Sequence, residues 1–249
     1  AVKDFTPERF ERETGVKKEL ITEAARMYAK AGSAAICYTM GITQFSDGTS
    51  NVFSLSNLAI LTGNLGKKGA GVNPLRGQNN VQGSCDMGAL PNVIPAGAVN
   101  SAYAQEQARK VWHFELNPVP GFKLTYAPDK MDSGELKVLY VYGENPVMSD
   151  PWTEHFVHAT HHLDCFIVQD LFFTESAQKA DVVLPAAGWG EKDGTFINTS
   201  RRVQRTRKAS EPVGGVEPDW KVVCNIAKAM GLEGFDFLSA EEVWDELRN

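Results

Sequence analysis

The chain has 249 residues, of which 43% are hydrophobic and 22% are charged, as is ordinary for a globular protein that buries a core. Its net charge of −6 argues against nucleic acid and anionic membranes as general partners. No apolar run approaches the about 20 residues that cross a bilayer, and the first residues lack a signal-peptide pattern. We therefore expect no direct membrane span and a cytoplasmic location.

The cysteines are far apart and form no C-x-x-C pair, which argues against an iron–sulfur cluster or a structural zinc site within this chain. We expect each to be a small buried residue in a reducing compartment. Cys85 differs from the others in lying within the glycine-rich segment described below. The four cysteines are Cys37, Cys85, Cys165 and Cys224.

The first third of the chain predicts helix, strand, loop and helix. Thr6-Pro7-Glu8 begins a helix with a capping hydroxyl and a proline in the first turn, and Gly15 ends it. The remaining elements are a helix over Val16–Ala31, a buried strand over Ala34–Tyr38 and a helix over Val52–Leu61.

A glycine-rich segment, Asn64–Gly88, follows and shows neither helical nor strand periodicity. Structureless loops of this length are uncommon in compact domains and are usually functional or disordered. Because this one carries apolar residues and few charges, an ordered loop that wraps a ligand is the better interpretation.

The second part of the chain alternates apolar strands with helices, which predicts a parallel sheet covered on both faces. A linker over Asn117–Ser133 separates it from an earlier helix. The expected strands are Leu136–Tyr142, Cys165–Val168 and Asp181–Pro185, and the expected helices are Ser101–Phe114, Pro151–His161, Trp220–Met230 and Ala240–Leu247. The predicted fold class is α/β, with Rossmann-like parallel sheets flanked by helices.

Polar residues follow three of the strands, and ligands bind at the carboxyl ends of strands in open parallel sheets. These residues are Met40–Gln44, Gly143–Pro146 and Gln169–Asp170. A carboxylate such as Asp170 can accept from a purine or a ribose hydroxyl, but it can equally cap the next helix. Both interpretations stay open.

Several basic residues admit two interpretations. Arg76, among glycines and amides, suits a small carboxylate or a phosphate, yet a surface arginine would look the same. Lys192 and the run Arg201–Lys208 suit phosphates, although solvated side chains are the commoner case.

Three histidines share one face of a predicted helix, at positions 155, 158 and 162. A metal site is one interpretation. No carboxylate or cysteine stands at supporting spacing, so a solvated face is the better prediction.

The motifs together resemble the molybdopterin oxidoreductase family. The segment Arg76–Gly83, which reads Arg-Gly-Gln-Asn-Asn-Val-Gln-Gly, is similar to the formate dehydrogenase branch in particular. The similarity runs almost end to end, through Met40–Gln44, Leu61–Gly66, Gly71–Gly88, Tyr142–Pro146, Gln169–Asp170, Ala180–Pro185 and Glu191–Gly194.

The resemblance implies a molybdenum or tungsten ion held by two pterin guanine dinucleotides (bis-molybdopterin guanine dinucleotide). It implies that Arg76 anchors the carboxylate of formate and that Gln78, a second catalytic candidate, lies with Gly77 against the pterin. Met40 and Gln44 would contact the pterin as well. The residues implied to hold the guanine nucleotide and its phosphates are Asn145, Gln169, Asp170, Lys192 and Asp219.

The family's cysteine-rich iron–sulfur domain, its cysteine or selenocysteine metal ligand and its last pterin-binding domain have no counterpart here. We therefore expect the middle segment of a large subunit, with parts of two adjoining domains over 1–78 and 79–249. Its partners would be the remainder of that subunit and iron–sulfur electron-transfer subunits, and the isolated chain would be inactive. A non-catalytic scaffold, or a family member that acts on another small substrate, is the alternative.

Overall fold

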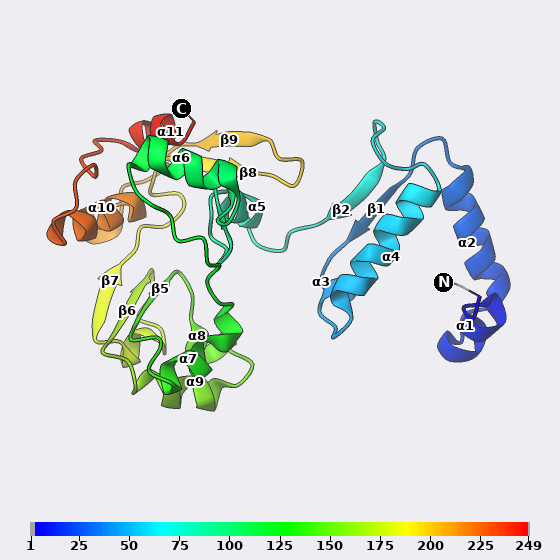
Figure 1. Cartoon of the computed structure of the whole chain (residues 1–249), viewed down its shortest axis with the longest axis horizontal. Helices are drawn as coiled ribbons and strands as arrows, with labels where there is room; N and C mark the ends of the chain where they lie inside the picture. Colours follow the sequence, from blue (N-terminus) through cyan, green and yellow to red (C-terminus); the bar gives the residue numbers. More distant parts are fainter. Residues whose placement is uncertain (1–2, 249) are drawn as a thin grey trace. The chain divides into compact units, whose positions relative to one another are not determined.

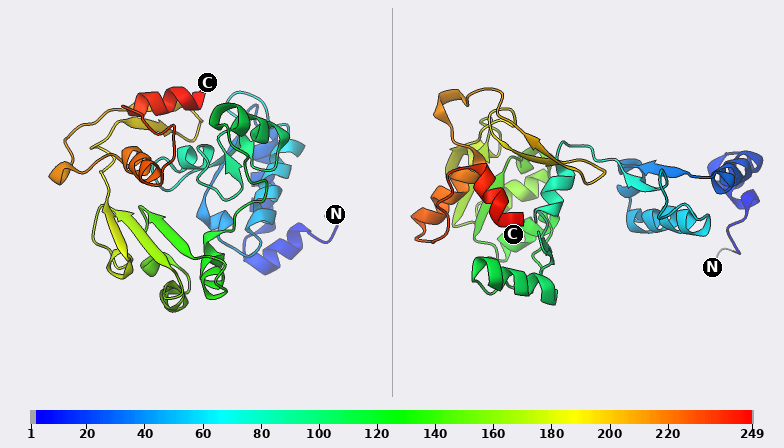
Figure 2. Two further views of the ribbon diagram at one scale, coloured as in Figure 1. Left: turned by 60° about the vertical axis from the view of Figure 1, so that its left-hand side comes forward. Right: turned by 90° about the horizontal axis from the view of Figure 1, so that it is seen from above.

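The computed structural model of the chain describes residues 3–248, which form two compact units. The first unit runs to Val81 and the second begins at Gln82, and each is described by itself (Figures 1 and 2). The predicted domains 1–78 and 79–249 refer to the domains of a larger subunit, and they stay a prediction.

The first unit contains the helices and the strand expected from the sequence, together with a short helix, α3, in the expected loop. Thr6 caps the first helix by accepting a hydrogen bond from the Arg9 amide at 3.3 Å, and Gly15 ends it in the left-handed region with φ of 73°. The elements are α1 (Pro7–Thr14), α2 (Lys18–Lys30), β1 (Ala35–Tyr38), α3 (Met40–Thr43), α4 (Gly48–Leu61) and β2 (Gly71–Pro74).

Strands β1 and β2 pair in parallel, from Ala35 beside Gly71 to Tyr38 beside Pro74. Strand β2 was not predicted from the sequence, because this short strand lies within the glycine-rich segment and carries no periodic pattern. Its regular structure comes from hydrogen bonds to β1, and the Leu75 amide continues the ladder by donating to the Tyr38 carbonyl at 2.8 Å. Helix α4 lies beside the two strands (Figure 1).

Helix α4 begins at Gly48, four residues before the predicted start. A β-carbon at Gly48 would collide with the backbone carbonyl of Thr43 in α3. The close approach of the two helices therefore requires glycine at this position. Residues 48–51 carry no apolar side chain, so the hydrophobic periodicity of the sequence predicted a start that is too late.

Asn64 is a fully buried polar residue of the first unit. Its side-chain oxygen accepts from the Ala34 amide at 3.1 Å, and its nitrogen donates to the Tyr28 carbonyl at 3.4 Å and to the Thr62 hydroxyl at 3.2 Å. One amide thus joins the end of α2, the start of β1 and the end of α4.

The second unit holds a three-stranded parallel sheet and two separate antiparallel strand pairs (Figures 1 and 2). Helix α5 (Val81–Asp86) crosses the boundary between the units. The helices are α6 (Ala102–Trp112), α7 (Ala127–Asp132), α8 (Pro146–Ser149), α9 (Thr153–Thr160), α10 (Asp219–Ala229) and α11 (Ala240–Arg248). The short 3-10 turns are η1 (Leu124–Tyr126), η2 (Ala177–Lys179) and η3 (Val213–Gly215). The strands are β3 (Val93–Ile94), β4 (Gly97–Ala98), β5 (Val138–Tyr142), β6 (Cys165–Asp170), β7 (Val182–Pro185), β8 (Gly194–Ile197) and β9 (Val203–Thr206).

The three-stranded sheet has the order β5-β6-β7, and all its strands run in the same direction. This confirms the predicted α/β fold with a parallel sheet. Leu139 and Val141 of β5 share one face with Phe166 and Val168 of β6, since alternate residues of a strand point the same way. This face packs against Ala177 and, through Leu139, against the helical core described next.

The predicted linker over Asn117–Ser133 is wrong in its last part, because residues 127–132 form α7. Met131 of α7 is fully buried with Phe156 and Ala159 of α9, in a cluster that also contains Ala127 and Val147. Proline at the start of a helix costs no hydrogen bond. Pro128 occupies such a first-turn position in α7 and is therefore compatible with the helix.

The opposite face of the sheet is only partly covered by the described residues. Val138 and Tyr142 of β5 are each 52% exposed on that face. The prediction that each cysteine is buried is wrong for Cys37, which lies exposed on β1. Only Cys224 among the four cysteines is buried. Within the part of the chain that the structure describes, these faces have no complete covering layer.

No helix among residues 3–248 is both long and apolar enough to cross a membrane.

The buried amide of Asn64 generates a prediction about the stability of the first unit. Substitution Asn64→Ala leaves the Ala34 amide and the Tyr28 carbonyl without their partner, so we expect a loss of about 1–3 kcal/mol in the free energy of unfolding of this unit. Native-state hydrogen exchange of the amides in β1 and α4 measures that loss.

Asn57→Ala is the matched control, because Asn57 lies exposed on α4. We expect it to leave the exchange rates unchanged or slightly lower, since alanine favours helix. Equal effects of the two substitutions would contradict the role assigned to Asn64.

Candidate functional site

The site residues predicted for the first unit follow the carboxyl ends of its two parallel strands. Met40 begins α3 directly after β1, and Gln44 is the residue that ends α3. Arg76, Gly77 and Gln78 follow β2. Because Tyr38 and Pro74 are partners in the ladder, both groups leave the sheet at the same edge. All five residues are exposed.

Arg76 and Gly77 have surroundings that leave room for a ligand. Among residues 3–248, no carboxylate forms an ion pair with Arg76. A β-carbon at Gly77 would meet no atom within 4 Å, and its φ lies outside the left-handed region. Neither backbone conformation nor packing within the chain therefore requires glycine here.

In the second unit, three predicted residues form one buried polar network. Gln169, at the end of β6, has no exposed surface and donates to the Asp219 carboxylate at 2.9 Å. Asp219 begins α10 and forms an ion pair with Lys192, which lies between β7 and β8. Burial lowers the pKa of the Lys192 ammonium below its usual value. The hydroxyl of Tyr140 on β5 donates to the side-chain oxygen of Gln169.

Asn145 anchors a second set of contacts after β5. Its side-chain oxygen accepts from the Ser176 amide at 3.1 Å and from the Ser176 hydroxyl at 2.7 Å, and its nitrogen donates to Glu175 at 2.7 Å. The hydrogen bond from Asn145 lowers the pKa of Glu175. Ser176 is itself buried and accepts from the Val147 amide at 3.1 Å. Asn145 therefore fixes the segment that follows β6.

Asp170 and the basic run occupy simpler surroundings. One oxygen of Asp170 accepts from the next amide, that of Leu171, at 2.6 Å, so the carboxylate closes a local turn and keeps its second oxygen available. The basic run Arg201–Lys208 contains β9, whose first three residues are exposed. A solvated strand face thus describes its position in this structure.

The donor and acceptor groups at these strand ends match the chemistry of a nucleotide. Carboxylates such as Asp170 and Asp219 accept from the ring N–H and amino groups of guanine, and an ammonium such as Lys192 pairs with phosphate. In this structure Asp219 and Lys192 form an ion pair with each other. A ligand would exchange these partners without leaving a buried polar group unpaired.

The sequence analysis missed three residues of these networks. Tyr140, Glu175 and Ser176 make direct side-chain contacts with predicted site residues. Of the three, only Tyr140 could have been identified from the sequence. Alternate residues of a strand share a face, so its hydroxyl can reach residues on the same face of a neighbouring strand. Glu175 and Ser176 lie in a connection and carried no signal.

The structure corrects the statement that no carboxylate supports the histidines. Asp132, the last residue of α7, has one oxygen 2.7 Å from His155 Nε2 and the other 3.0 Å from His162 Nδ1. The carboxylate comes from a different helix, 23 residues before the first of these histidines. Spacing along one helix therefore could not identify it.

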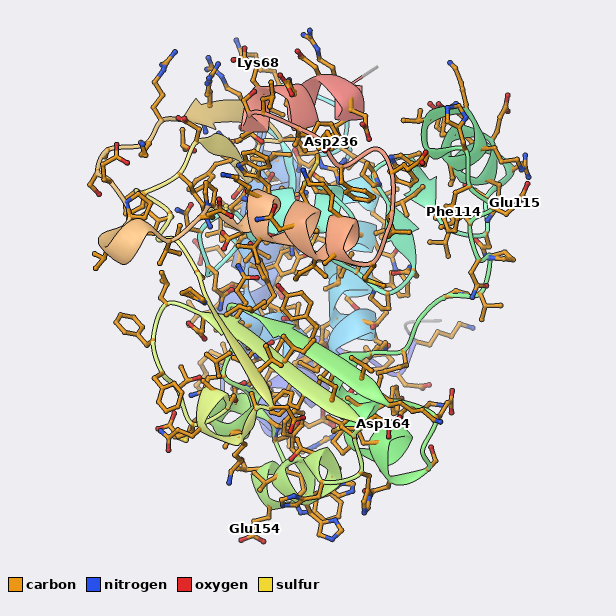
Figure 3. All side chains as sticks on the ribbon, turned by 90° about the vertical axis from the view of Figure 1, so that its left-hand side faces the viewer. Lys68, Phe114, Glu115, Glu154, Asp164 and Asp236 are labelled. Atoms are coloured by element: carbon orange, nitrogen blue, oxygen red, sulfur yellow. The ribbon has the colours of Figure 1, made fainter. Side chains whose placement is uncertain are left out.

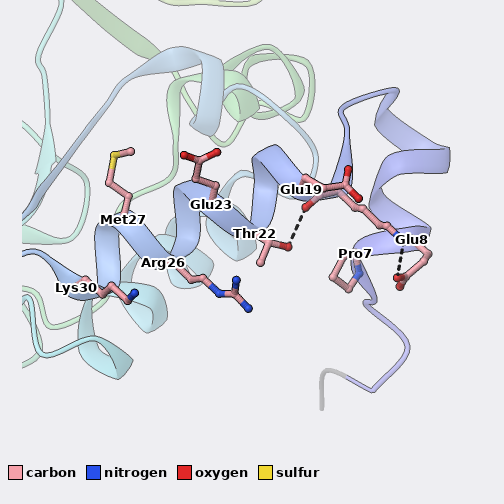
Figure 4. A pocket seen from close by; sticks show the side chains of 9 residues that line it. Pro7, Glu8, Glu19, Thr22, Glu23, Arg26, Met27 and Lys30 are labelled. Carbon is pink, nitrogen blue, oxygen red and sulfur yellow. Dashed lines mark hydrogen bonds and ion pairs between the residues drawn. The ribbon is translucent and has the colours of Figure 1, made fainter.

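A separate hollow in the first unit contains none of the predicted site residues. It lies on α1 and α2, and Figure 4 shows side chains of both signs around it, including Glu8, Arg26 and Lys30. Its lining mixes exposed acidic and basic groups without a convergent set of donors or acceptors. We assign it no function.

The chain is similar to catalytic subunits of formate dehydrogenases. It is 52% identical over 246 residues to the F420-dependent formate dehydrogenase 1 subunit alpha of Methanococcus maripaludis, and this match covers 98% of the chain and 36% of that protein. It is 45% identical over 250 residues to formate dehydrogenase H of Escherichia coli, which covers 100% of the chain and 35% of that protein. The chain thus spans about a third of the length of these relatives.

A solved structure agrees at the level of the fold. Acetylene hydratase from Pelobacter acetylenicus superposes with a TM-score of 0.73 at 17% sequence identity, over 97% of this chain and 36% of that one. The sequence profile of the molybdopterin oxidoreductase family matches residues 15–229. The resemblance predicted from the sequence motifs is confirmed: the chain belongs to the molybdopterin oxidoreductase family, whose members use a molybdopterin cofactor.

Proposed function

We propose that this chain is a segment of the catalytic subunit of a formate dehydrogenase, which interconverts formate and carbon dioxide. The observation that carries the proposal is the placement of Arg76, Gly77 and Gln78 at the same sheet edge as Met40. The relatives named formate dehydrogenase support it, because their similarity extends over nearly the whole chain.

In this proposal the cofactor is a molybdenum or tungsten ion held by two pterin guanine dinucleotides. When bound, it accepts the two electrons of formate oxidation. Met40, Gln44, Gly77 and Gln78 contact the pterin from the first unit. The side chains that contact a guanine nucleotide belong to the second unit, namely Asn145, Gln169, Asp170, Lys192 and Asp219.

Arg76 is the residue that binds the substrate in this proposal. Its planar guanidinium donates two parallel hydrogen bonds to a carboxylate, which fixes the orientation of a molecule as small as formate. Because Arg76 has no ion pair among the described residues, it need not give up a protein partner when formate binds. Orientation of this kind lowers the entropic part of the barrier.

The exposed apolar surface supports a larger subunit around the chain. Leu61 at the end of α4 is 85% exposed, and Phe53 of the same helix is also exposed. A helix with apolar residues on all sides is normally buried. The two-stranded sheet of the first unit likewise has two free edges among the described residues. We therefore propose that the remainder of the subunit covers these surfaces, with iron–sulfur subunits as further partners, and that the isolated chain has no turnover.

The proposed role of Arg76 predicts a specific kinetic defect in a complete catalytic subunit that carries this sequence. Arg76→Ala should lower kcat/KM for formate about 10- to 100-fold, which corresponds to the loss of a charge-assisted hydrogen bond worth about 1.5–3 kcal/mol. Arg76→Lys should recover only part of the activity, because an ammonium keeps the charge and lacks the fork.

Arg26→Ala is the matched control, since Arg26 is also exposed but lies on α2 (Figure 4). Steady-state kinetics with formate as the varied substrate measures the effect. Unchanged kcat/KM in Arg76→Ala, with the cofactor fully loaded, would reject the assignment.

Gly77 predicts a separation of cofactor binding from stability. Because its backbone conformation is ordinary and its surroundings are open, Gly77→Ala should leave the stability of the unloaded chain unchanged or raise it by about 0.4–1 kcal/mol. The same substitution should lower the molybdopterin content of the complete subunit, because the methyl group occupies the space of the pterin.

Gly32→Ala is the control, since Gly32 has equally open surroundings away from the strand ends. Denaturant unfolding and quantification of released pterin are the two measurements. A Gly77→Ala subunit that loads as much cofactor as the Gly32→Ala subunit would count against a pterin contact at this position.

The second unit should recognise guanine through Asp170. We expect the chain to bind GMP more tightly than AMP, and we expect Asp170→Asn to reduce that preference by about tenfold. The substitution keeps the side-chain oxygen that accepts from the Leu171 amide, so the local turn is retained.

Asp164→Asn is a suitable control, because Asp164 is exposed and precedes β6 at the opposite edge of the sheet, where Figure 3 labels it. NMR titration of the chain with each nucleotide measures the two affinities. If the preference for GMP is absent in the unmodified chain, or survives in Asp170→Asn, Asp170 does not read the base.

A further inference from the structure

A cluster of metal-ligating side chains lies in the second unit, outside the proposed cofactor site. Asp132, His158 and His162 each offer one ligand atom, and these atoms all lie within 4.8 Å of one another. In a tetrahedral site, ligand atoms that lie about 2.0–2.2 Å from zinc are about 3.3–3.6 Å from one another. Small rotations of exposed side chains therefore suffice to bring the three atoms around one ion.

The residue types in this cluster select a class of metal ion. Two imidazoles with one carboxylate form a common ligand set for zinc and its neighbours in the first transition series. Calcium and magnesium prefer oxygen ligands throughout, which two of these three side chains do not provide. The rings of His158 and His162 lie edge to face with centroids 5.3 Å apart, so both imidazoles are already close.

A fourth side chain orients the carboxylate. His155 Nε2 lies 2.7 Å from one oxygen of Asp132, while the other oxygen lies 3.0 Å from His162 Nδ1. Hydrogen bonds from neighbouring groups commonly hold a metal ligand in its binding orientation. His155 thus acts as a positioning residue, and the contact between Asp132 and His162 keeps two ligands together before an ion arrives.

The backbone beneath the cluster is held by the core of the second unit. Met131, next to Asp132, and Ala159, next to His158, are both fully buried in the cluster that joins α7 and α9. The amide of His162 donates to the Ala159 carbonyl at 3.0 Å, which fixes the chain just after α9. Ligands on packed helices are held more firmly than ligands on loops.

We propose that Asp132, His158 and His162 form a surface binding site for one divalent transition-metal ion, of which Zn²⁺ is the probe. The site is independent of the molybdopterin chemistry and needs no other part of a larger subunit. The chain also offers a matched internal control, because His161 lies between two of the ligands in the sequence and is not part of the cluster.

The test is a titration of the full chain with ZnCl₂, followed by calorimetry and by NMR of the histidine ring nitrogens. We expect one Zn²⁺ per chain, with shifts at His158 and His162 and their reversal by EDTA. His158→Ala should weaken binding at least tenfold, and His161→Ala should bind like the unmodified chain. Because exposed Cys37 is a competing thiol, the titration is repeated with Cys37→Ser, which should not change the result.

Asp132→Asn provides a second variant and should also weaken binding at least tenfold. If this variant fails to fold, His158→Ala still decides the question, because His158 is exposed and its removal breaks no buried contact. Three results would overturn the proposal: no binding by the unmodified chain, equal affinity in His158→Ala and His161→Ala, or ring shifts confined to other histidines.

Discussion

Parallel pairing of neighbouring strands is the constraint on which the rest of this structure depends. In a parallel ladder all strands end at the same edge, so the segments that follow β1 and β2 leave the first unit together. The same holds for β5, β6 and β7 in the second unit. Each return to the start of the next strand needs a crossover: α4 lies between β1 and β2, α9 between β5 and β6, and the short turn η2 between β6 and β7. The functional residues can therefore stand in connections and still converge.

The buried polar network of the second unit shows how such an edge remains stable without a ligand. Gln169 is fully buried, and an amide without partners there would cost about 1–3 kcal/mol. Hydrogen bonds with Tyr140 and Asp219 remove that cost, and the ion pair with Lys192 balances the charge of Asp219. A nucleotide bound here, as proposed, would have to replace these contacts with equivalent ones. This requirement favours a ligand that presents both an N–H edge and a phosphate, as a guanine nucleotide does.

The sequence predicted a structural feature when the residues that cause it lie within a few positions of one another. It did not predict features that depend on a partner far away in the sequence. The capping hydroxyl of Thr6 and the apolar run of β6 act within a few residues, so their elements were predicted. Strand β2 depends on hydrogen bonds to β1, whose paired residues lie 36 positions earlier in the sequence. No local pattern reveals these hydrogen bonds. Asp132 reaches the histidines only because α7 packs on α9, which requires knowledge of the core. The sequence placed Asn145 directly after β5, whereas no local pattern could predict its contacts with Glu175 and Ser176.

The exposed position of Arg76 has a consequence for how specificity arises. In water, an ion pair between an exposed guanidinium and a small carboxylate gives about 0–1 kcal/mol, too little to select formate from other anions. The same fork gains much more when water is excluded, because a low dielectric strengthens each charge-assisted hydrogen bond. The first unit provides the charge and its place at the strand ends, but it exposes apolar residues such as Leu61 that another surface would have to cover. Selectivity for a substrate at Arg76 would therefore arise on assembly, when the surface that covers these apolar residues also removes water from the guanidinium.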